Sequence, residues 1–140
     1  MLECLILGDS IAVGTHRARP ECVAYAKGGI NTWQFNKMYP GEFFSDAVII
    51  SLGSNDHKGV HTRKELEKLR NRIVAKNKVY WILPAGNLKA GGVDIVEIQQ
   101  IVEDIANKNG DIIIPIQGLS KDGIHPTGNG YKIISQQIKN

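Results

Sequence analysis

Apolar residues in this chain form short, unbroken runs, and the segments between the runs repeat their apolar positions every three or four residues. The run Ala47-Val48-Ile49-Ile50 is typical of the first kind. A strand without alternating polar positions is buried on both faces, as in a parallel sheet covered by helices. The sequence therefore predicts five strands, at Leu2–Gly8, Cys22–Ala26, Ala47–Gly53, Val79–Leu83 and Asp111–Ile116.

The segments between the strands have the periodicity of amphipathic helices. Thr62-Arg63-Lys64-Glu65 matches a capping box, and Leu66, Leu69 and Ile73 follow it as one apolar stripe. The later helices carry similar stripes, and Asn109-Gly110 is a typical end for one of them. We expect a short helix after Ser10, one that starts at Thr62, and others over Thr32–Met38, Val93–Asn107 and Gly128–Lys139.

Strands and helices alternate along all 140 residues without a linker or repeat, which predicts a single domain over residues 1–140. Right-handed crossovers then give an α/β fold, a doubly wound three-layer α/β/α sandwich around a five-stranded parallel sheet. We expect the flavodoxin-like strand order 2-1-3-4-5. Ligands of such sheets bind beyond the carboxyl ends of the strands, at the switch point beside the first strand.

Residues suited to acyl transfer follow four of the predicted strands. Ser10 follows the first strand, Gly28-Gly29 the second, and Asn55 the third, while Asp122 and His125 follow the fifth. The topology brings them to one edge of the sheet. A hydroxyl, an imidazole with a carboxylate three residues away, a backbone N–H and an amide are a nucleophile, a base, its orienter and an oxyanion hole.

Each of these signals alone has a plainer explanation. A serine at a helix start is commonly an N-cap, and Asp122-Gly123 alone suggests a turn. Asn55 could close an Asx turn, and the glycine pair could serve a loop that requires positive φ. All four segments occur together, each at the end of a different strand and each with a different role. This combination is what indicates a serine hydrolase.

The four segments resemble the conserved blocks of the SGNH hydrolases, the small three-layer branch of the GDSL esterase and lipase superfamily. Gly8-Asp9-Ser10 is similar to the nucleophile block, Gly29 to the glycine block, and Gly53-Ser54-Asn55-Asp56 to the Gly-x-Asn-Asp block. Asp122-Gly123-Ile124-His125-Pro126 resembles the Asp-x-x-His-Pro block, the most specific of the four. Together the blocks span residues 8–131 in the family's order.

The resemblance implies a serine esterase without a cofactor or metal. Ser10 would be the nucleophile, His125 the base and Asp122 its orienter. The oxyanion hole would be formed by Ser10, Gly29 and Asn55, with Gly28 as the alternative to Gly29. The loops are short, which favours small substrates such as acetyl esters of sugars or other small alcohols. Acyl transfer by the same residues and a non-catalytic binding module remain alternatives, and Trp33 either lines the substrate site or packs in the core.

Composition narrows the partners and the location. The net charge is only +3 and the basic residues are scattered, which argues against a nucleic-acid partner. No apolar run is long enough for a membrane helix.

We expect Cys4 and Cys22, each inside a predicted strand, to be free buried thiols. We expect His57 and His61 to lie at the edge of the substrate cleft without binding a metal. Because the first strand begins at Leu2, we expect no signal peptide and a cytoplasmic protein.

Overall fold

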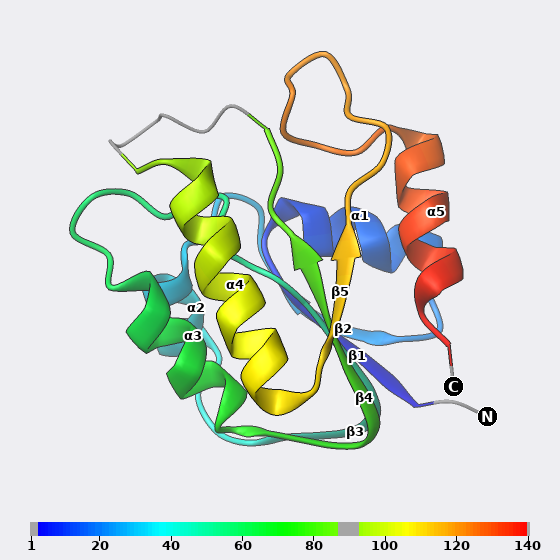
Figure 1. Ribbon diagram of the computed structural model, residues 1–140. Coiled ribbons are helices and arrows are strands. Elements are labelled where there is room, and N and C mark those ends of the chain that lie inside the picture. The colour runs from blue at the N-terminus through cyan, green and yellow to red at the C-terminus, as the bar shows by residue number, and fades with distance from the viewer. Residues whose placement is uncertain (1–2, 87–92, 140) are drawn as a thin grey trace.

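The computed structural model describes residues 3–86 and 93–139 and has five parallel strands between two layers of helices (Figure 1). The strands are β1 (Cys4–Gly8), β2 (Val23–Ala26), β3 (Phe43–Ser51), β4 (Ile73–Leu83) and β5 (Ile112–Pro115). Their order in the sheet is β2-β1-β3-β4-β5, and every neighbouring pair is parallel. The predicted α/β class and strand order are confirmed.

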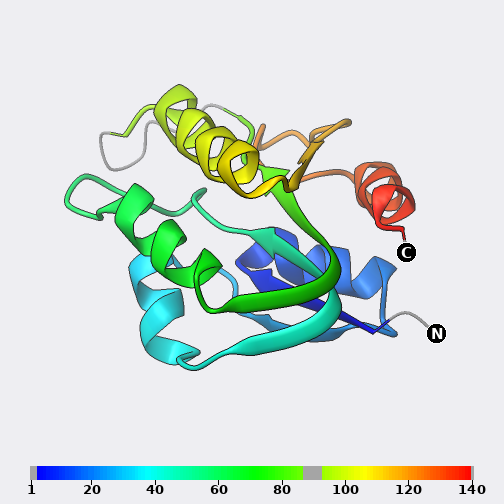
Figure 2. The same cartoon turned by 60° about the horizontal axis from the view of Figure 1, so that its bottom comes forward.

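The helices divide between the two faces of the sheet. Helices α1 (Ser10–Ala18) and α5 (Gly128–Gln137) cover one face, and α2 (Thr32–Met38), α3 (Thr62–Arg70) and α4 (Ile95–Asn109) cover the other (Figure 2). Successive strand residues point to opposite faces, so Ile49 packs in the core under α1 and α5 whereas Ile50 packs in the core under α2, α3 and α4. Both side chains are fully buried, which explains the unbroken apolar runs.

Strands β3 and β4 begin earlier than the sequence predicts, at Phe43 and Ile73. Their early portions leave Phe44 and Val74 exposed, so no unbroken apolar run marks them. A register shift between Ser45 and Ala47 separates this part of the β3–β4 ladder from the buried part. Ile73 therefore belongs to β4 and not to the predicted helical stripe. Leu2, where we expected the first strand to begin, lies outside the described residues.

The predicted capping box at Thr62 is wrong. Helix α3 starts at Thr62, but its N-cap residue is His61, which makes no side-chain capping bond. The Thr62 hydroxyl donates instead to Oδ2 of Asp56 at 2.6 Å. The Thr62 hydroxyl therefore bonds to a buried carboxylate in the preceding loop, and not to the helix backbone as the capping-box motif predicts.

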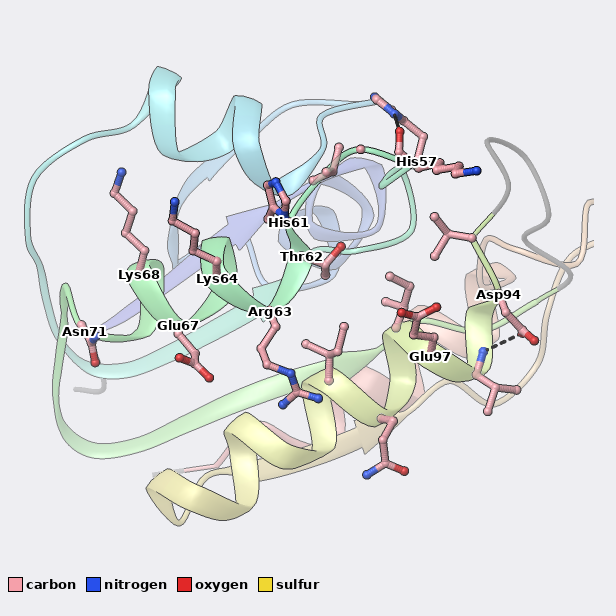
Figure 3. Close-up of a pocket in the computed structure, with 18 residues that line it drawn as sticks. His57, His61, Thr62, Arg63, Lys64, Glu67, Lys68, Asn71, Asp94 and Glu97 are labelled. Carbon is pink, nitrogen blue, oxygen red and sulfur yellow. Dashed lines mark hydrogen bonds between the residues drawn. The ribbon is translucent and has the colours of Figure 1, made fainter.

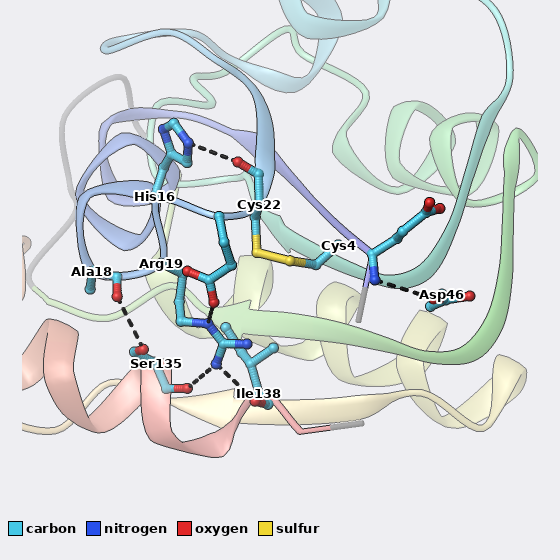
Figure 4. The surroundings of a disulfide bond; sticks show 10 residues. Cys4, His16, Ala18, Arg19, Cys22, Asp46, Ser135 and Ile138 are labelled. Atoms are coloured by element: carbon cyan, nitrogen blue, oxygen red, sulfur yellow. Dashed lines mark hydrogen bonds and ion pairs between the residues drawn. A yellow bond between two sulfur atoms is a disulfide. The ribbon is translucent and has the colours of Figure 1, made fainter. Parts of the chain in front are cut away.

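The prediction of free thiols is also wrong, because Cys4 and Cys22 form a disulfide (Figure 4). Their Cα atoms are 4.8 Å apart, the separation of neighbouring strands, and so the two side chains can be bridged. The bond joins the start of β1 to the residue before β2, at the end of the sheet opposite to Ser10. Beside it, Nη1 of Arg19 donates to the carbonyls of Ser135 and Ile138, both at 2.9 Å, and so ties α1 to α5.

No helix within residues 3–86 and 93–139 is long and apolar enough to cross a bilayer.

Candidate active site

The nucleophile turn joins β1 to α1 and is pressed against β3. A Cβ atom on Gly8 would lie 1.8 Å from the carbonyl oxygen of Ser51, so only glycine fits there. The next N–H, that of Asp9, donates to this same carbonyl at 3.0 Å. Asp9 is the N-cap of α1 and accepts a hydrogen bond from the Ile11 N–H through Oδ1, at 3.0 Å. Ser10 is thereby fixed as the first residue of α1.

Asp9 is buried directly beneath this turn. Its Oδ1 also accepts a hydrogen bond from the Ser51 hydroxyl at 3.1 Å, whereas Oδ2 has no hydrogen-bond partner among the described residues. Burial raises the pKa of Asp9 to about 6, because the charged carboxylate loses its hydration. Asp9 therefore braces the nucleophile turn and places a carboxyl with a raised pKa under the nucleophile.

The loop between β5 and α5, orange in Figure 1, lies beyond the carboxyl ends of β4 and β5. Its backbone closes on itself: the Ser120 N–H donates to the His125 carbonyl at 2.8 Å, and the Thr127 N–H to the Gly118 carbonyl at 2.8 Å. Oδ1 of Asp122 accepts from the backbone N–H groups of Ile124 and His125 at 2.8 and 2.9 Å. These bonds hold the Asp122 and His125 side chains in one orientation.

The structure brings the predicted nucleophile, base and orienter into one hydrogen-bonded chain. Oγ of Ser10 lies 2.7 Å from Nε2 of His125, and Nδ1 of His125 lies 2.6 Å from Oδ2 of Asp122. The backbone N–H of Ile124, then that of His125, hold the pKa of Asp122 well below its usual range. An ionised Asp122 favours the imidazole tautomer with its hydrogen on Nδ1, and Nε2 is then free to accept the serine proton.

The predicted oxyanion-hole residues lie around the loop after β2. A Cβ atom on Gly28 would lie 3.8 Å from Cβ of Ser10, so Gly28 is beside the nucleophile. Gly29 has a φ of +79°, which other residues adopt only with strain. The Asn55 amide donates to the Ile30 carbonyl at 3.1 Å, which joins the loop after β3 to the glycine loop. This bond uses one of the two N–H groups of the Asn55 side-chain amide, and the other can donate to an oxyanion.

Asp56 explains why the loops after β2 and β3 hold together. Its buried carboxylate accepts hydrogen bonds from the Thr32 N–H at 2.9 Å and from the Thr32 hydroxyl at 2.7 Å, besides the one from Thr62. It therefore ties the first turns of α2 and α3 to the loop that carries Asn55.

A hollow of about 440 Å³ lies beside Ser10, between α1 and α5. It is lined by Ser10, Val13, Gly14, Arg17, Gly28, His125, Pro126 and Tyr131. Arg17 was not predicted from the sequence, although its position seven residues after Ser10 on one helix was a usable signal. Trp33 is not among the lining residues; it is 51% exposed on α2, which rules out the alternative of a core position. Its contact with substrate stays a prediction.

A larger groove, of about 1370 Å³, lies between α3 and α4, away from Ser10 (Figure 3). His57 and His61 line it, together with side chains of both charges. Arg63 points from α3 towards α4 and pairs with Asp104 at 2.9 Å. The groove contains none of the residues of the Ser10–His125–Asp122 chain. We therefore place the candidate active site at the smaller hollow.

No protein-family model and no curated protein sequence matches this chain. Several solved structures do match it along nearly its whole length. A member of the lipolytic G-D-S-L family from Veillonella parvula has a TM-score of 0.69 and 18% identity, covering 97% of this chain and 95% of its own. A carbohydrate acetylesterase family member from Sinorhizobium meliloti has a TM-score of 0.67 and 14% identity, with coverage of 96% and 94%.

The C-terminal catalytic domain of peptidoglycan O-acetyltransferase A from Streptococcus pneumoniae has the same architecture. Its TM-score is 0.68 at 16% identity, with coverage of 96% of this chain and 88% of that domain. The chain thus has the fold of the lipolytic G-D-S-L proteins, the fold that the sequence motifs implied. Because one fold can carry many activities, the function has to be argued from the site.

Proposed function

We propose that the protein is a serine esterase of the SGNH type that hydrolyses short-chain acyl esters, acetyl esters first among them. The observation that carries the proposal is the unbroken hydrogen-bonded chain from Ser10 through His125 to Asp122. A serine, an imidazole and a carboxylate in this order are the constellation of nucleophilic acyl transfer. The fold shared with the lipolytic G-D-S-L protein supports the proposal without establishing the activity.

The reaction begins when Oγ of Ser10 attacks the ester carbonyl carbon and its proton passes to Nε2 of His125. Asp122 stays ionised and stabilises the imidazolium through Nδ1–H. The carbonyl oxygen becomes an oxyanion. Its donors in this proposal are the N–H of Ser10, the N–H of Gly29 and the side-chain amide of Asn55, with Gly28 as the alternative to Gly29. Donors held in place before the reaction cost no reorganisation when the charge develops.

The tetrahedral intermediate collapses when the bond to the alcohol oxygen breaks. His125 gives its proton to that oxygen, the alcohol leaves, and the acyl group remains on Ser10 as an ester. A water molecule then gives a proton to His125 and attacks the acyl carbon, which releases the carboxylic acid and restores the serine. Another alcohol in place of water would turn hydrolysis into acyl transfer, so product analysis with competing alcohols separates the two outcomes.

Two features bear on substrate and location. The hollow beside Ser10 has a volume of about 440 Å³, which suits an ester of a small alcohol. The described residues also include a disulfide, which is more common in oxidising compartments than in the cytosol. The cytoplasmic location therefore stays a prediction, and the disulfide argues against it.

A fluorophosphonate probe tests the proposal, because it phosphonylates an activated serine with loss of fluoride. We expect labelling of Ser10, located by mass spectrometry, no labelling of Ser10→Ala, and much slower labelling of His125→Ala. Ser135→Ala changes a serine on α5 outside the site and is the matched control. Labelling of another residue, or equal labelling of the His125→Ala protein, would overturn the proposal.

A further inference from the structure

Arg17 lies on the face of α1 that carries the nucleophile. It follows Ser10 by seven residues, which places it two turns away on the same side of the helix, about 10 Å along the axis. Helical side chains tilt towards the amino terminus, so Arg17 leans back towards Ser10. Both residues line the hollow beside the nucleophile.

Tyr131 of α5 covers the helix between these two residues. A Cβ atom on Gly14 would lie 2.2 Å from Cζ of Tyr131 and 2.5 Å from its hydroxyl oxygen, so the phenol rests directly on Gly14. Tyr131 and Arg17 both line the hollow beside Ser10. A cation and a hydroxyl donor thus share one wall of the hollow.

Neither group is occupied by another part of the described chain. Within residues 3–86 and 93–139, Arg17 takes part in no ion pair and Tyr131 makes no side-chain hydrogen bond. No carboxylate lines the hollow. A guanidinium and a phenol that face such a space suit a planar anion, since arginine can donate two parallel hydrogen bonds to a carboxylate.

The position of His125 decides which part of an ester enters the hollow. In the proposed reaction His125 must protonate the leaving oxygen, so the alcohol part has to lie within hydrogen-bond reach of Nε2. The hollow has His125 and Pro126 on its wall together with Arg17 and Tyr131. The group attached to the leaving oxygen therefore extends towards the guanidinium.

We propose that the alcohol part of the substrate carries a carboxylate, and that Arg17 and Tyr131 bind this carboxylate beside the active serine. This proposal rests on the esterase function and names the substrate class of the same site: acyl esters of small hydroxy acids. Arg17 acts as a specificity residue, because it contacts the substrate away from the reacting atoms.

A matched pair of esters tests the proposal. One is 4-acetoxybenzoate, whose alcohol part is an anion, and the other is 4-acetoxybenzamide, its neutral counterpart. The measured quantity is the ratio of kcat/KM for the anionic ester to kcat/KM for the neutral ester, which cancels differences in the amount of folded protein. We expect Arg17→Gln to lower this ratio by about 10- to 100-fold, from loss of the bidentate ion pair.

Three further proteins sharpen the result. Lys132→Gln removes an exposed charge from α5 outside the hollow and should leave the ratio within about twofold of wild type. Arg17→Lys should keep part of the preference, because the charge remains while the planar fork is lost. Tyr131→Phe should lower the ratio about threefold or more, through loss of one hydrogen bond to a charged group.

The outcomes separate this proposal from the esterase function. Hydrolysis of the neutral ester that depends on Ser10, with the same ratio in wild type and Arg17→Gln, would overturn the carboxylate proposal alone. Hydrolysis of neither ester by wild type would overturn the esterase function and the carboxylate proposal with it.

Discussion

The Ser51 hydroxyl donates to Oδ1 of Asp9 at 3.1 Å, inside the core and directly below the turn that carries the nucleophile. This pair joins the carboxyl ends of β1 and β3, the two central strands next to the site. The hydrogen bond from Ser51 reaches only Oδ1 of the buried carboxylate, and Oδ2 has no hydrogen-bond partner among the described residues. The nucleophile turn is therefore held in place by the Asp9 carboxyl, whose ionised form makes the folded state less stable.

The first prediction is that Asp9 makes folding less favourable as the pH rises. The pKa of Asp9 is raised from 3.8 to about 6 in the folded protein, so between these values the folded state binds more protons than the unfolded state. The contribution of Asp9 to stability is then largest at low pH and is lost as the pH rises through about 6. Asparagine also caps helices well, so Asp9→Asn should keep the cap and remove this titration.

The measurement is the free energy of unfolding of both proteins at about pH 4.5 and about pH 7.5. From about pH 4.5 to about pH 7.5, the difference in free energy of unfolding between Asp9→Asn and wild type should shift by roughly 2 kcal/mol in favour of Asp9→Asn. The reason is that each unit of pKa shift corresponds to about 1.4 kcal/mol. Asp94→Asn at the exposed N-cap of α4 shows how much of any change an ordinary capping carboxylate contributes. A constant difference between wild type and Asp9→Asn would contradict the assignment.

The second prediction concerns the disulfide between Cys4 and Cys22, which are 18 positions apart. Closing a loop of this length restricts the unfolded chain, and its loss should cost about 3 kcal/mol and lower Tm by roughly 10 °C. Esterase activity below the new Tm should be retained, because the bond lies at the far end of the sheet from Ser10. The double variant Cys4→Ala/Cys22→Ala tests both statements by thermal unfolding and by assay. Reaction of both cysteines with a thiol reagent in unreduced, denatured protein would show that no bond forms.

The third prediction separates two roles of Asn55. If its amide donates to the oxyanion, Asn55→Ala should lower kcat by roughly 10²-fold with p-nitrophenyl acetate. If its only role is the hydrogen bond to the Ile30 carbonyl, the variant should have a lower Tm and a kcat within a few-fold of wild type. Measuring both quantities on one preparation decides between a catalytic and a purely structural amide.

The sheet could be predicted from the sequence because strands buried on both faces leave an unambiguous pattern. Ile49 and Ile50 belong to two different cores, and no polar position interrupts them. The exposed beginnings of β3 and β4 have no such pattern and were missed. The predicted span Thr32–Met38 of α2 is confirmed, because Asn31 caps it and the chain turns before Pro40.

Contacts that depend on strand register or on loop packing could not be predicted. The bond between Cys4 and Cys22 requires knowing which residues of β1 and β2 lie side by side. Thr62 donates to a carboxylate six residues earlier, and no local motif reveals that choice. The chain from Ser10 to Asp122 was accessible because its members follow strands whose ends the topology gathers at one edge.

The most direct test of the central claim is the turnover of p-nitrophenyl acetate by wild type and by Ser10→Ala. Serine, base and orienter act as one unit, so the variant should lose at least ~10³-fold in kcat while its Tm stays close to that of wild type. Ser135→Ala, measured alongside, should match wild type. Equal turnover by the wild-type and Ser10→Ala proteins would contradict the account, because the reaction would then not pass through Ser10.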